Sequence, residues 1–220
     1  MCGRYLITTN VEALRRLFGF KGGPDLQPRF NLAPTQSAPV VRLSAAGERE
    51  LIMLRWGLIP SSAKNPAIGN RMINARAATL AEKASFRAAL RDRRCLVLAD
   101  GFYEWQKQGA KKQPYFIKAA DGLPFAMGGL WERWNDHASG ETIESFTIVT
   151  TAANEALLPI HERMPIILDA PGQETWLGTR SAEGLAPLLG PSAVPMSAYP
   201  VTTFVNSPKN DSPVCIEPAP

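Results

Sequence analysis

The fold is decided by the stretch from Cys95 to Thr151, which opens with Cys-Leu-Val-Leu-Ala (95–99) and closes with Ile-Glu-Ser-Phe-Thr-Ile-Val-Thr-Thr (143–151). Three further strand-like segments lie between them, at 103–107, 114–118 and 125–131. Turn signals such as Gln108-Gly109 and Asp121-Gly122 separate the segments. We therefore expect a run of consecutive antiparallel strands in a sheet that curls on itself.

Helices and a hairpin are expected around this stretch. Thr9-x-x-Glu12 has capping-box spacing and precedes an amphipathic pattern that stops at Gly19. A second capping-box pattern, Thr79-x-x-Glu82, opens a segment rich in helix formers that ends at Leu90. Residues 38–43 and 51–56 flank a turn and predict a hairpin, and short helices are expected at 154–158, 173–177 and 182–189. The prediction is one α+β domain over residues 1–220, with a mostly antiparallel, barrel-like sheet and peripheral helices.

Composition narrows the class of protein. The chain has 220 residues, 45% of them apolar, and a formal net charge of +4, which suits a folded enzyme or binding module. Its apolar runs fall short of the roughly 20 residues that a membrane span needs, and its first residues lack a secretion-signal pattern, so we expect a cytoplasmic protein. Three cysteines and two histidines disfavour a disulfide framework and a zinc site with closely spaced ligands. No metal or cofactor is expected.

Positive charge is concentrated between residues 71 and 94. This segment contains two acidic and seven basic residues, which gives it a formal charge of +5. The basic residues are Arg71, Arg76, Lys83, Arg87, Arg91, Arg93 and Arg94. A basic face attracts polyanions, of which nucleic acid is the usual one. A solvated helix face would have the same composition, and this alternative stays open.

Cys2 is the position with the most specific chemistry. Removal of Met1 would leave a chain that begins with a 1,2-aminothiol, whose amine and thiol titrate near pH 8. The amine can condense with an aldehyde to an imine, and the thiol can then close on the imine carbon to form a thiazolidine. The same group could serve an N-terminal-nucleophile hydrolase. Alternatively, Cys2 is an ordinary small residue after Met1.

Glu104 and His161 are candidates for proton transfer. Aromatic residues flank Glu104, and apolar surroundings favour a protonated carboxyl that can act as a general acid or base near neutrality. His161 lies between two prolines in a turn, and an imidazole titrates near pH 6.5. Glu104 could instead face solvent on its strand, and His161 could be structural. Asp100 competes with Glu104, although its place before a glycine is typical of a turn, and His137 reads as part of a hairpin loop.

Asn74 and Arg76 precede the basic segment. An amide can orient a polar intermediate, and a guanidinium group is the preferred partner of a phosphate. Both residues could therefore face an anionic ligand at a helix entrance. The alternative is an ordinary helix cap.

Seven segments in order along the chain resemble the SOS-response-associated peptidase (SRAP) family of abasic-site processing proteins. The resemblance covers essentially the whole chain, and seven motifs in register make it specific. The segments are Met1-Cys2-Gly3-Arg4, Arg29-Phe30-Asn31-Leu32-Ala33-Pro34-Thr35, Trp56-Gly57-Leu58-Ile59-Pro60, Asn74-Ala75-Arg76, Ala99-Asp100-Gly101-Phe102-Tyr103-Glu104-Trp105, Ile160-His161-Glu162-Arg163-Met164-Pro165 and Asn206-Ser207-Pro208-Lys209-Asn210-Asp211.

The resemblance implies a β-rich α+β domain with a basic cleft that binds single-stranded DNA at abasic sites. Cys2 would be the nucleophile that forms a thiazolidine with the ring-opened sugar and so shields the lesion. Asn74 would position the reacting groups, Glu104 would act as acid and base, and His161 would assist ring opening. Arg4, Arg76 and Arg163 match arginines near the DNA backbone.

The family is also thought to release Met1 autocatalytically and to reverse its own crosslink. We expect a monomer, with no membrane partner. Two positions depart from the family pattern: Ala78 replaces a glutamate, and Ser62 stands near a position where relatives often have a base-stacking tryptophan. Two other functions stay open, namely an N-terminal-nucleophile peptidase or amidohydrolase acting in trans, and a basic nucleic-acid-binding module in which Cys2 is incidental.

Overall fold

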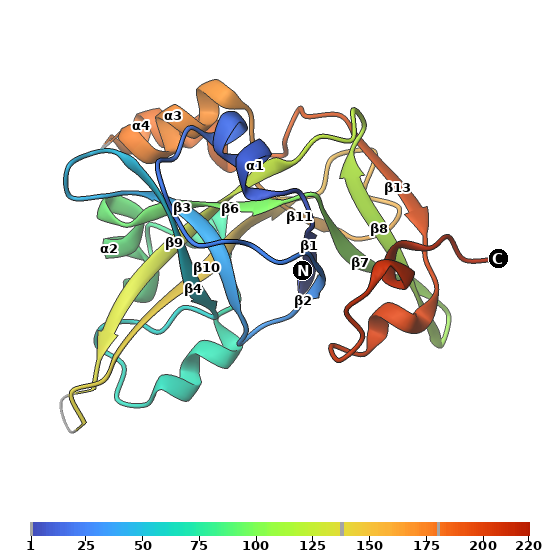
Figure 1. Ribbon diagram of the computed structural model, residues 1–220, viewed down its shortest axis with the longest axis horizontal. Helices are drawn as coiled ribbons and strands as arrows, with labels where there is room; N and C mark the ends of the chain where they lie inside the picture. The colour runs from blue at the N-terminus through green and yellow to red at the C-terminus, as the bar shows by residue number, and fades with distance from the viewer. Residues whose placement is uncertain (1, 137–138, 180) are drawn as a thin grey trace.

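Five strands close into a ring that forms one half of the molecule (Figure 1). The computed structural model describes residues 2–136, 139–179 and 181–220. Antiparallel pairing links β4 to β3, β3 to β6, β6 to β9 and β9 to β10, and a parallel pairing of β10 with β4 closes the ring. The five strands are β3 (Ser37–Leu43), β4 (Arg49–Trp56), β6 (Arg94–Ala99), β9 (Phe125–Asn135) and β10 (Thr142–Ala152).

A second sheet lies beside the ring. Its strands run in the order β13-β8-β7-β1-β2, and every pairing is antiparallel. They are β1 (Arg4–Ile7), β2 (Arg29–Leu32), β7 (Gly101–Gln108), β8 (Lys111–Ala119) and β13 (Met196–Pro200). Three short strands extend the ring: β5 (Asn74–Arg76) and β11 (Arg163–Pro165) pair with β10, and β12 (Ile167–Leu168) pairs with β9. The N-terminal strand thus lies in the second sheet, while β5 and β11 belong to the ring.

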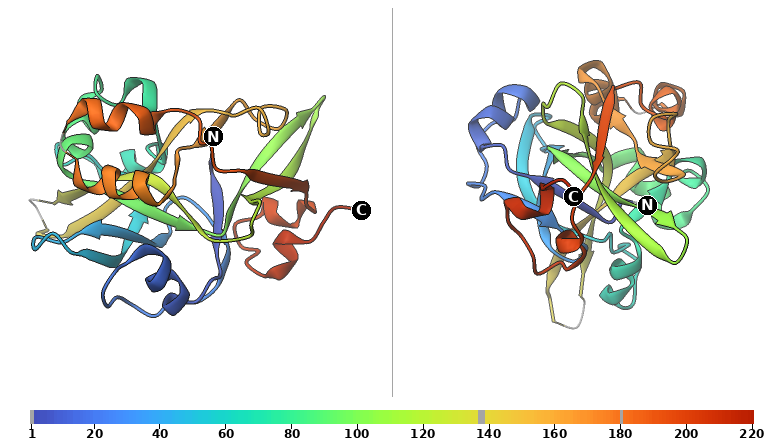
Figure 2. Two further views of the ribbon diagram at one scale, coloured as in Figure 1. Left: turned by 90° about the horizontal axis from the view of Figure 1, so that it is seen from above. Right: turned by 90° about the vertical axis from the view of Figure 1, so that its right-hand side faces the viewer.

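Helices cover the margins of the sheets. They are α1 (Val11–Phe18), α2 (Ala84–Asp92), α3 (Ala170–Gly178) and α4 (Ala182–Leu185), with 3₁₀ turns at Pro66–Arg71, Ala77–Thr79, Ala186–Leu189, Thr203–Asn206 and Pro213–Ile216. Figure 2 shows α2, α3 and α4 at one end of the molecule and the C-terminal segment at the other. Within residues 2–136, 139–179 and 181–220, no helix combines the length and apolar character needed to cross a membrane.

The α+β class and the mostly antiparallel, barrel-like sheet are confirmed, as is the hairpin of residues 38–43 and 51–56. The expected pairing of consecutive strands is wrong at two points, because segments 95–99 and 103–107 lie in different sheets, and so do segments 114–118 and 125–131. The reason at the first point is the turn at Asp100. Its backbone N–H donates to Leu6 O at 2.9 Å and its carboxylate accepts bonds from Thr8 and Thr9, so β7 pairs with β1 instead.

The predicted helix starts need correction. Asn10, not Thr9, caps α1 by accepting from the Ala13 N–H at 3.0 Å, since the Thr9 hydroxyl donates to Asp100. The helix expected at 79–90 is α2 and begins at Ala84, because residues 77–79 form a 3₁₀ turn. Residues 154–158 form hydrogen-bonded turns instead of a helix. The helix expected at 173–177 is confirmed and is part of α3. The helix expected at 182–189 is also confirmed and consists of α4 and the 3₁₀ turn that follows it.

Replacing Gly101 with alanine is expected to destabilise the fold. A Cβ atom at Gly101 would lie 2.6 Å from Cζ of the buried Phe116 ring and 2.7 Å from Ile117 O, and neither can move without disturbing the β7–β8 pairing. We expect a loss of about 3 kcal/mol in the free energy of unfolding. Thermal unfolding followed by circular dichroism measures it. Gly178→Ala is the matched control because, apart from its chain neighbours and its own helix backbone, no atom of the described residues lies within 4 Å of its Cβ position, and an equal loss in both variants would contradict this account.

Candidate active site

Four predicted residues meet between the ring and the second sheet. Cys2 lies two residues before β1, and the register of β1 with β7 places Arg4 opposite Tyr103, so the chain leading to Cys2 runs beside Glu104. Asn74 begins β5 and His161 lies two residues before β11. Both short strands pair with the C-terminal part of β10, β5 with residues 148–150 and β11 with residues 150–152, so both candidates lie near that end of the strand.

Asn74 is bonded to Cys2. Its Nδ2 donates to the Cys2 carbonyl oxygen at 2.8 Å, and the Cys2 side chain is fully buried. The Asn74 Oδ1 is also buried and accepts no hydrogen bond from any residue that the structure describes. One end of the amide therefore fixes the Cys2 backbone, while the other offers an acceptor beside it.

Glu104 and His161 face each other. The Glu104 Oε2 lies 3.9 Å from the His161 Nε2, and Glu104 is only 3% exposed. The Arg163 N–H donates to His161 Nδ1 at 3.0 Å. The Arg163 carbonyl oxygen also lies 3.2 Å from Nδ1, so Nδ1 can accept or donate according to the tautomer, while Nε2 faces Glu104.

Burial changes the acidity of the two groups that carry exchangeable protons. Burial raises the pKa of Glu104 above its usual range, so a protonated carboxyl persists to higher pH than in water. Burial, and after it the charge of Glu104, raise the pKa of the Cys2 thiol far above its usual range. In this state the thiol is protonated at neutral pH. A base must take its proton before it can attack, and Glu104 is a neighbouring carboxylate that could do so.

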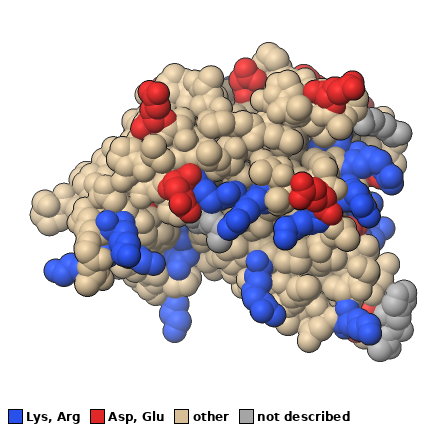
Figure 3. Space-filling view, turned by 180° about the vertical axis from the view of Figure 1, so that it is seen from behind, with Lys and Arg blue, Asp and Glu red and all other residues tan. Residues whose placement is uncertain are grey.

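Arg76 and Arg163, which stand two residues after Asn74 and His161 in the chain, both line a pocket of about 430 Å³. Burial first, and then the like charge of Arg76, lower the pKa of the Arg163 guanidinium. Arg76 also lines a second pocket of about 450 Å³, which Asn74, Arg71 and Lys83 share. Three basic residues thus line a pocket together with Asn74. Figure 3 shows Lys and Arg side chains in a band across one face of the molecule.

Arg4 has a different environment. Its Nη1 donates to the Asn31 Oδ1 and to Val205 O, both at 3.0 Å, and its Nη2 donates to Asn206 O at 3.2 Å. These bonds tie the first strand to the C-terminal segment. That Arg4 lies near a DNA backbone stays a prediction, and its observed contacts are with protein acceptors.

Sequence reasoning assigned no role to Asn31 and Asp211, which hold this region together. The buried Asn31 Nδ2 donates to three carbonyl oxygens of residues 205, 207 and 210, at 2.7–3.1 Å. The Asp211 Oδ1 accepts from the N–H groups of Phe30 and Asn31. Both residues belong to segments that resemble the SRAP family, and that resemblance was the one feature of the sequence that could have pointed to them.

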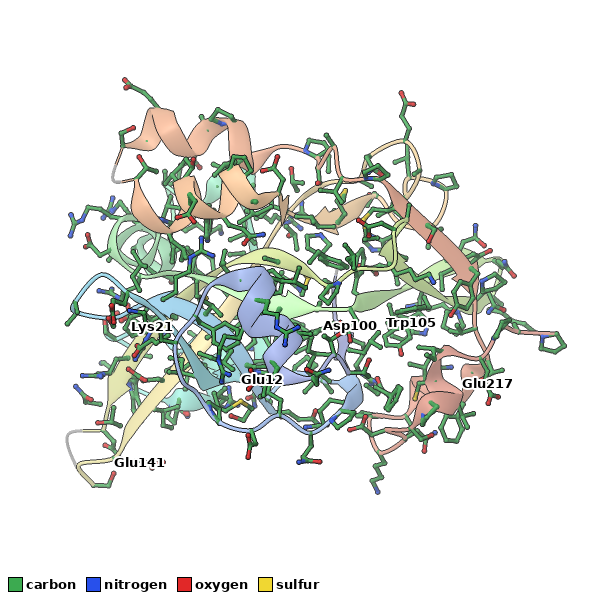
Figure 4. All side chains as sticks on the ribbon, turned by 45° about the horizontal axis from the view of Figure 1, so that its top comes forward. Glu12, Lys21, Asp100, Trp105, Glu141 and Glu217 are labelled. Carbon is green, nitrogen blue, oxygen red and sulfur yellow. The ribbon has the colours of Figure 1, made fainter. Side chains whose placement is uncertain are left out.

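Asp100 is a structural carboxylate. Its Oδ2 accepts from the Thr8 hydroxyl and the Thr9 N–H, and its Oδ1 accepts from the Thr9 hydroxyl. In Figure 4, Asp100 and Trp105 mark the two ends of the β7 segment that carries Glu104. The interpretation of Asp100 as a turn residue is therefore confirmed. His137 lies outside the residues that the structure describes.

The basic residues between 71 and 94 do not form one surface. Arg91 pairs with Asp92 at 2.9 Å, and Arg93 pairs with the buried Glu132 at 2.7 Å. Arg94 is buried and donates to backbone carbonyls, including Arg91 O at 2.8 Å. The interpretation of the whole segment as a single basic face is wrong. Only its first half, with Arg71, Arg76 and Lys83, borders the candidate site.

The described residues contain no cluster of side chains that could bind a metal ion. Among residues 2–136, 139–179 and 181–220, no group of three or more His, Cys, Asp and Glu side chains could hold a metal ion. Cys2, Cys95 and Cys215 are free, buried thiols.

Comparison with known proteins identifies the family. The family model described as SOS response associated peptidase (SRAP) matches residues 1–208. The chain belongs to the SRAP family. Among relatives, the abasic site processing protein YoqW of Bacillus subtilis is 41% identical over 224 residues, which cover 99% of each chain. The abasic site processing protein HMCES of Xenopus tropicalis is 33% identical over 98% of this chain and 78% of its own length.

Solved structures agree with the SRAP assignment. A crystal structure of a protein from Bacteroides thetaiotaomicron matches with a TM-score of 0.89 and 30% identity over the full length of both chains. A second structure, from Bordetella bronchiseptica, matches with a TM-score of 0.78 and 27% identity over 91% of this chain. The fold described above is thus shared with these two solved structures.

Glu104→Gln is expected to stabilise the protein at alkaline pH. A raised pKa in the folded state means that the ionised carboxyl opposes folding, and that this cost grows as the pH rises through the folded-state pKa. Below the unfolded-state pKa both states are protonated, and the neutral amide then brings no gain. At pH 8 we expect the variant to melt at a higher temperature than the wild type, by about 2–4 °C for each kcal/mol that the buried carboxylate costs the folded state. At pH 4 the two melting temperatures should be nearly equal.

Thermal unfolding of both proteins across this pH range is the measurement. Glu155→Gln, at an exposed position, is the control and should show no such pH-dependent difference. A melting temperature for Glu104→Gln that falls below the wild type at pH 8 would show that the carboxylate stabilises the fold, contrary to the sign expected here.

Proposed function

We propose that this SRAP protein captures abasic sites in single-stranded DNA as a covalent thiazolidine formed by Cys2. The observation that carries the proposal is the contact of Asn74 with Cys2 and of Glu104 with His161, while Arg76 and Arg163, two residues further along the chain from Asn74 and His161, line one pocket. The names of the curated relatives, abasic site processing protein, support the substrate class.

The first step is loss of Met1. Hydrolysis of the peptide bond between Met1 and Cys2 consumes one water and leaves a free α-amine on the same residue as the thiol. Either a separate aminopeptidase or the chain itself performs this step. The Asn74 bond to the Cys2 carbonyl supports the proposal, because it would hold the new N-terminal residue in place after cleavage.

The second step opens the sugar. An abasic deoxyribose is mostly a closed hemiacetal, so a proton must leave the anomeric hydroxyl and another must reach the ring oxygen. Glu104 and His161 form an acid–base pair suited to this exchange, because the carboxyl has a raised pKa and faces the imidazole Nε2. The product is an aldehyde.

The third step closes the ring. The Cys2 amine adds to the aldehyde carbon and water leaves, which gives an imine. The thiol sulfur then adds to the imine carbon while its proton passes to the nitrogen, so that the thiazolidine forms without further loss of atoms. An imine alone would leave the strand open to β-elimination at the 3′ phosphate. Ring closure removes the C=N bond that makes the neighbouring proton acidic, and the strand stays intact.

Cys2→Ser is expected to abolish the heat-stable crosslink. Serine leaves an amine that forms at most a reversible imine or oxazolidine, because its hydroxyl is a poor nucleophile at neutral pH. Denaturing electrophoresis of the protein mixed with an abasic oligonucleotide measures the product. Cys215→Ser is the matched control, since it removes another buried thiol and leaves Cys2 in place. A heat-stable adduct with Cys2→Ser would refute the assignment.

The same assay separates the proposal from its main alternative. An N-terminal-nucleophile peptidase would hydrolyse amides in trans at a rate that does not depend on DNA. Turnover of peptide substrates by the wild type, without any DNA adduct, would favour that function instead.

Crosslinking is expected to be faster on unpaired DNA than on duplex DNA. A sugar that must enter a pocket costs less to extrude from a single strand, because fewer base pairs and stacks are lost. Rates on one abasic oligonucleotide, alone and annealed to its complement, measure the difference. Equal rates on both substrates would contradict the single-strand preference.

A further inference from the structure

Thr150 lies between the two short strands that carry the candidate site. In the register of the sheet it stands opposite Arg76 of β5 on one side and opposite Pro165 of β11 on the other. Its side chain is fully buried within the protein, although the residue borders the pocket of about 430 Å³. One residue of β10 thus contacts both segments that supply functional groups.

The Thr150 hydroxyl has two partners, one on each of these segments. It accepts a hydrogen bond from the Arg163 Nη2 at 2.5 Å, and the Thr150 carbonyl accepts from the same nitrogen at 2.9 Å. The hydroxyl also donates to Ala75 O at 3.5 Å, a long bond to the residue between Asn74 and Arg76. The direction of the Arg163 guanidinium is therefore set by Thr150.

This orientation places two like charges at one pocket. The Arg163 Nε is buried and has no hydrogen-bond partner among the described residues, and the exposed Arg76 lies close enough to disfavour the charge on Arg163. Glu162 is the one acidic residue among those that line this pocket. A phosphate placed between two guanidinium groups would relieve their repulsion and supply acceptors in the fork geometry that arginine favours.

We propose that Thr150 is a positioning residue, which holds the Arg163 guanidinium beside Arg76 so that the pair binds one DNA phosphate. This inference rests on the proposed function and goes beyond it by assigning a residue that touches neither the sugar nor the phosphate. The hydroxyl is the essential group. Serine should therefore replace threonine, whereas valine, which has nearly the same shape, should not.

The test measures how the affinity for DNA depends on salt. The probe is a single-stranded oligonucleotide with one tetrahydrofuran abasic analogue, which has no anomeric hydroxyl and cannot form a crosslink. Each phosphate contact on a single strand adds about 0.7 to the slope of log K against log salt concentration. We expect Thr150→Val and Thr150→Ala to lower the slope by about 0.7, and Thr150→Ser to retain the wild-type value.

Thr147→Val is the matched control, because Thr147 is also a buried threonine of β10 and its hydroxyl has no partner among the described residues. It should leave the slope unchanged. Thermal unfolding shows which variants are folded, and Thr150→Ala carries the test if the valine variant does not fold. A merely structural role would lower the melting temperature without a change in slope.

The outcomes separate this inference from the proposed function. Wild-type slopes in folded Thr150→Val or Thr150→Ala protein would overturn the role of Thr150, while the proposed function would stand. A wild-type protein that shows no salt-dependent binding to the probe would count against the proposed function itself, and the inference would fall with it.

Discussion

The pairing of β1 with β7 is the constraint on which the site depends. It draws the first residues of the chain into the space between the ring and the second sheet, where Cys2 is fully buried and its carbonyl oxygen accepts a bond from Asn74. A chain terminus is usually among the most mobile parts of a protein. Here the backbone pairing of β1 and the side-chain amide of Asn74 fix Cys2, so the entropy of ordering this residue is lost on folding.

Local patterns predicted the class of fold well. Alternation and turn signals indicated the strands of residues 95–151, because each strand is short and each turn carries its own sequence mark. The pairing of those strands could not be predicted in the same way. The Asp100 carboxylate bonds to Thr8 and Thr9, which are more than ninety positions away in the sequence, and no local pattern encodes that contact. The predicted start of α1 was wrong for a similar reason. The Thr9 hydroxyl donates to Asp100, so Asn10 caps the helix instead.

The candidate site was predictable where a residue type has distinctive chemistry. Cys2, Glu104 and His161 could be selected by their nucleophilic or proton-transfer groups, and the family resemblance added Arg4 and Arg163. Charge counting was less reliable, because Arg93 and Arg94 serve buried contacts that composition cannot distinguish from a solvent-exposed face. Thr150 carried no signal at all: a threonine in a strand is unremarkable until its two hydrogen-bond partners are known.

The bonds that join Arg4 and Asn31 to residues 205–210 have a consequence for how the protein is made. During synthesis, the beginning of the chain leaves the ribosome while most of its partners are still untranslated. The first strand can be locked in place only after nearly the whole polypeptide has emerged. A nascent or truncated product therefore lacks the bonds that hold β1 and β2 against the C-terminal segment, and the surroundings of Cys2 are completed late in synthesis.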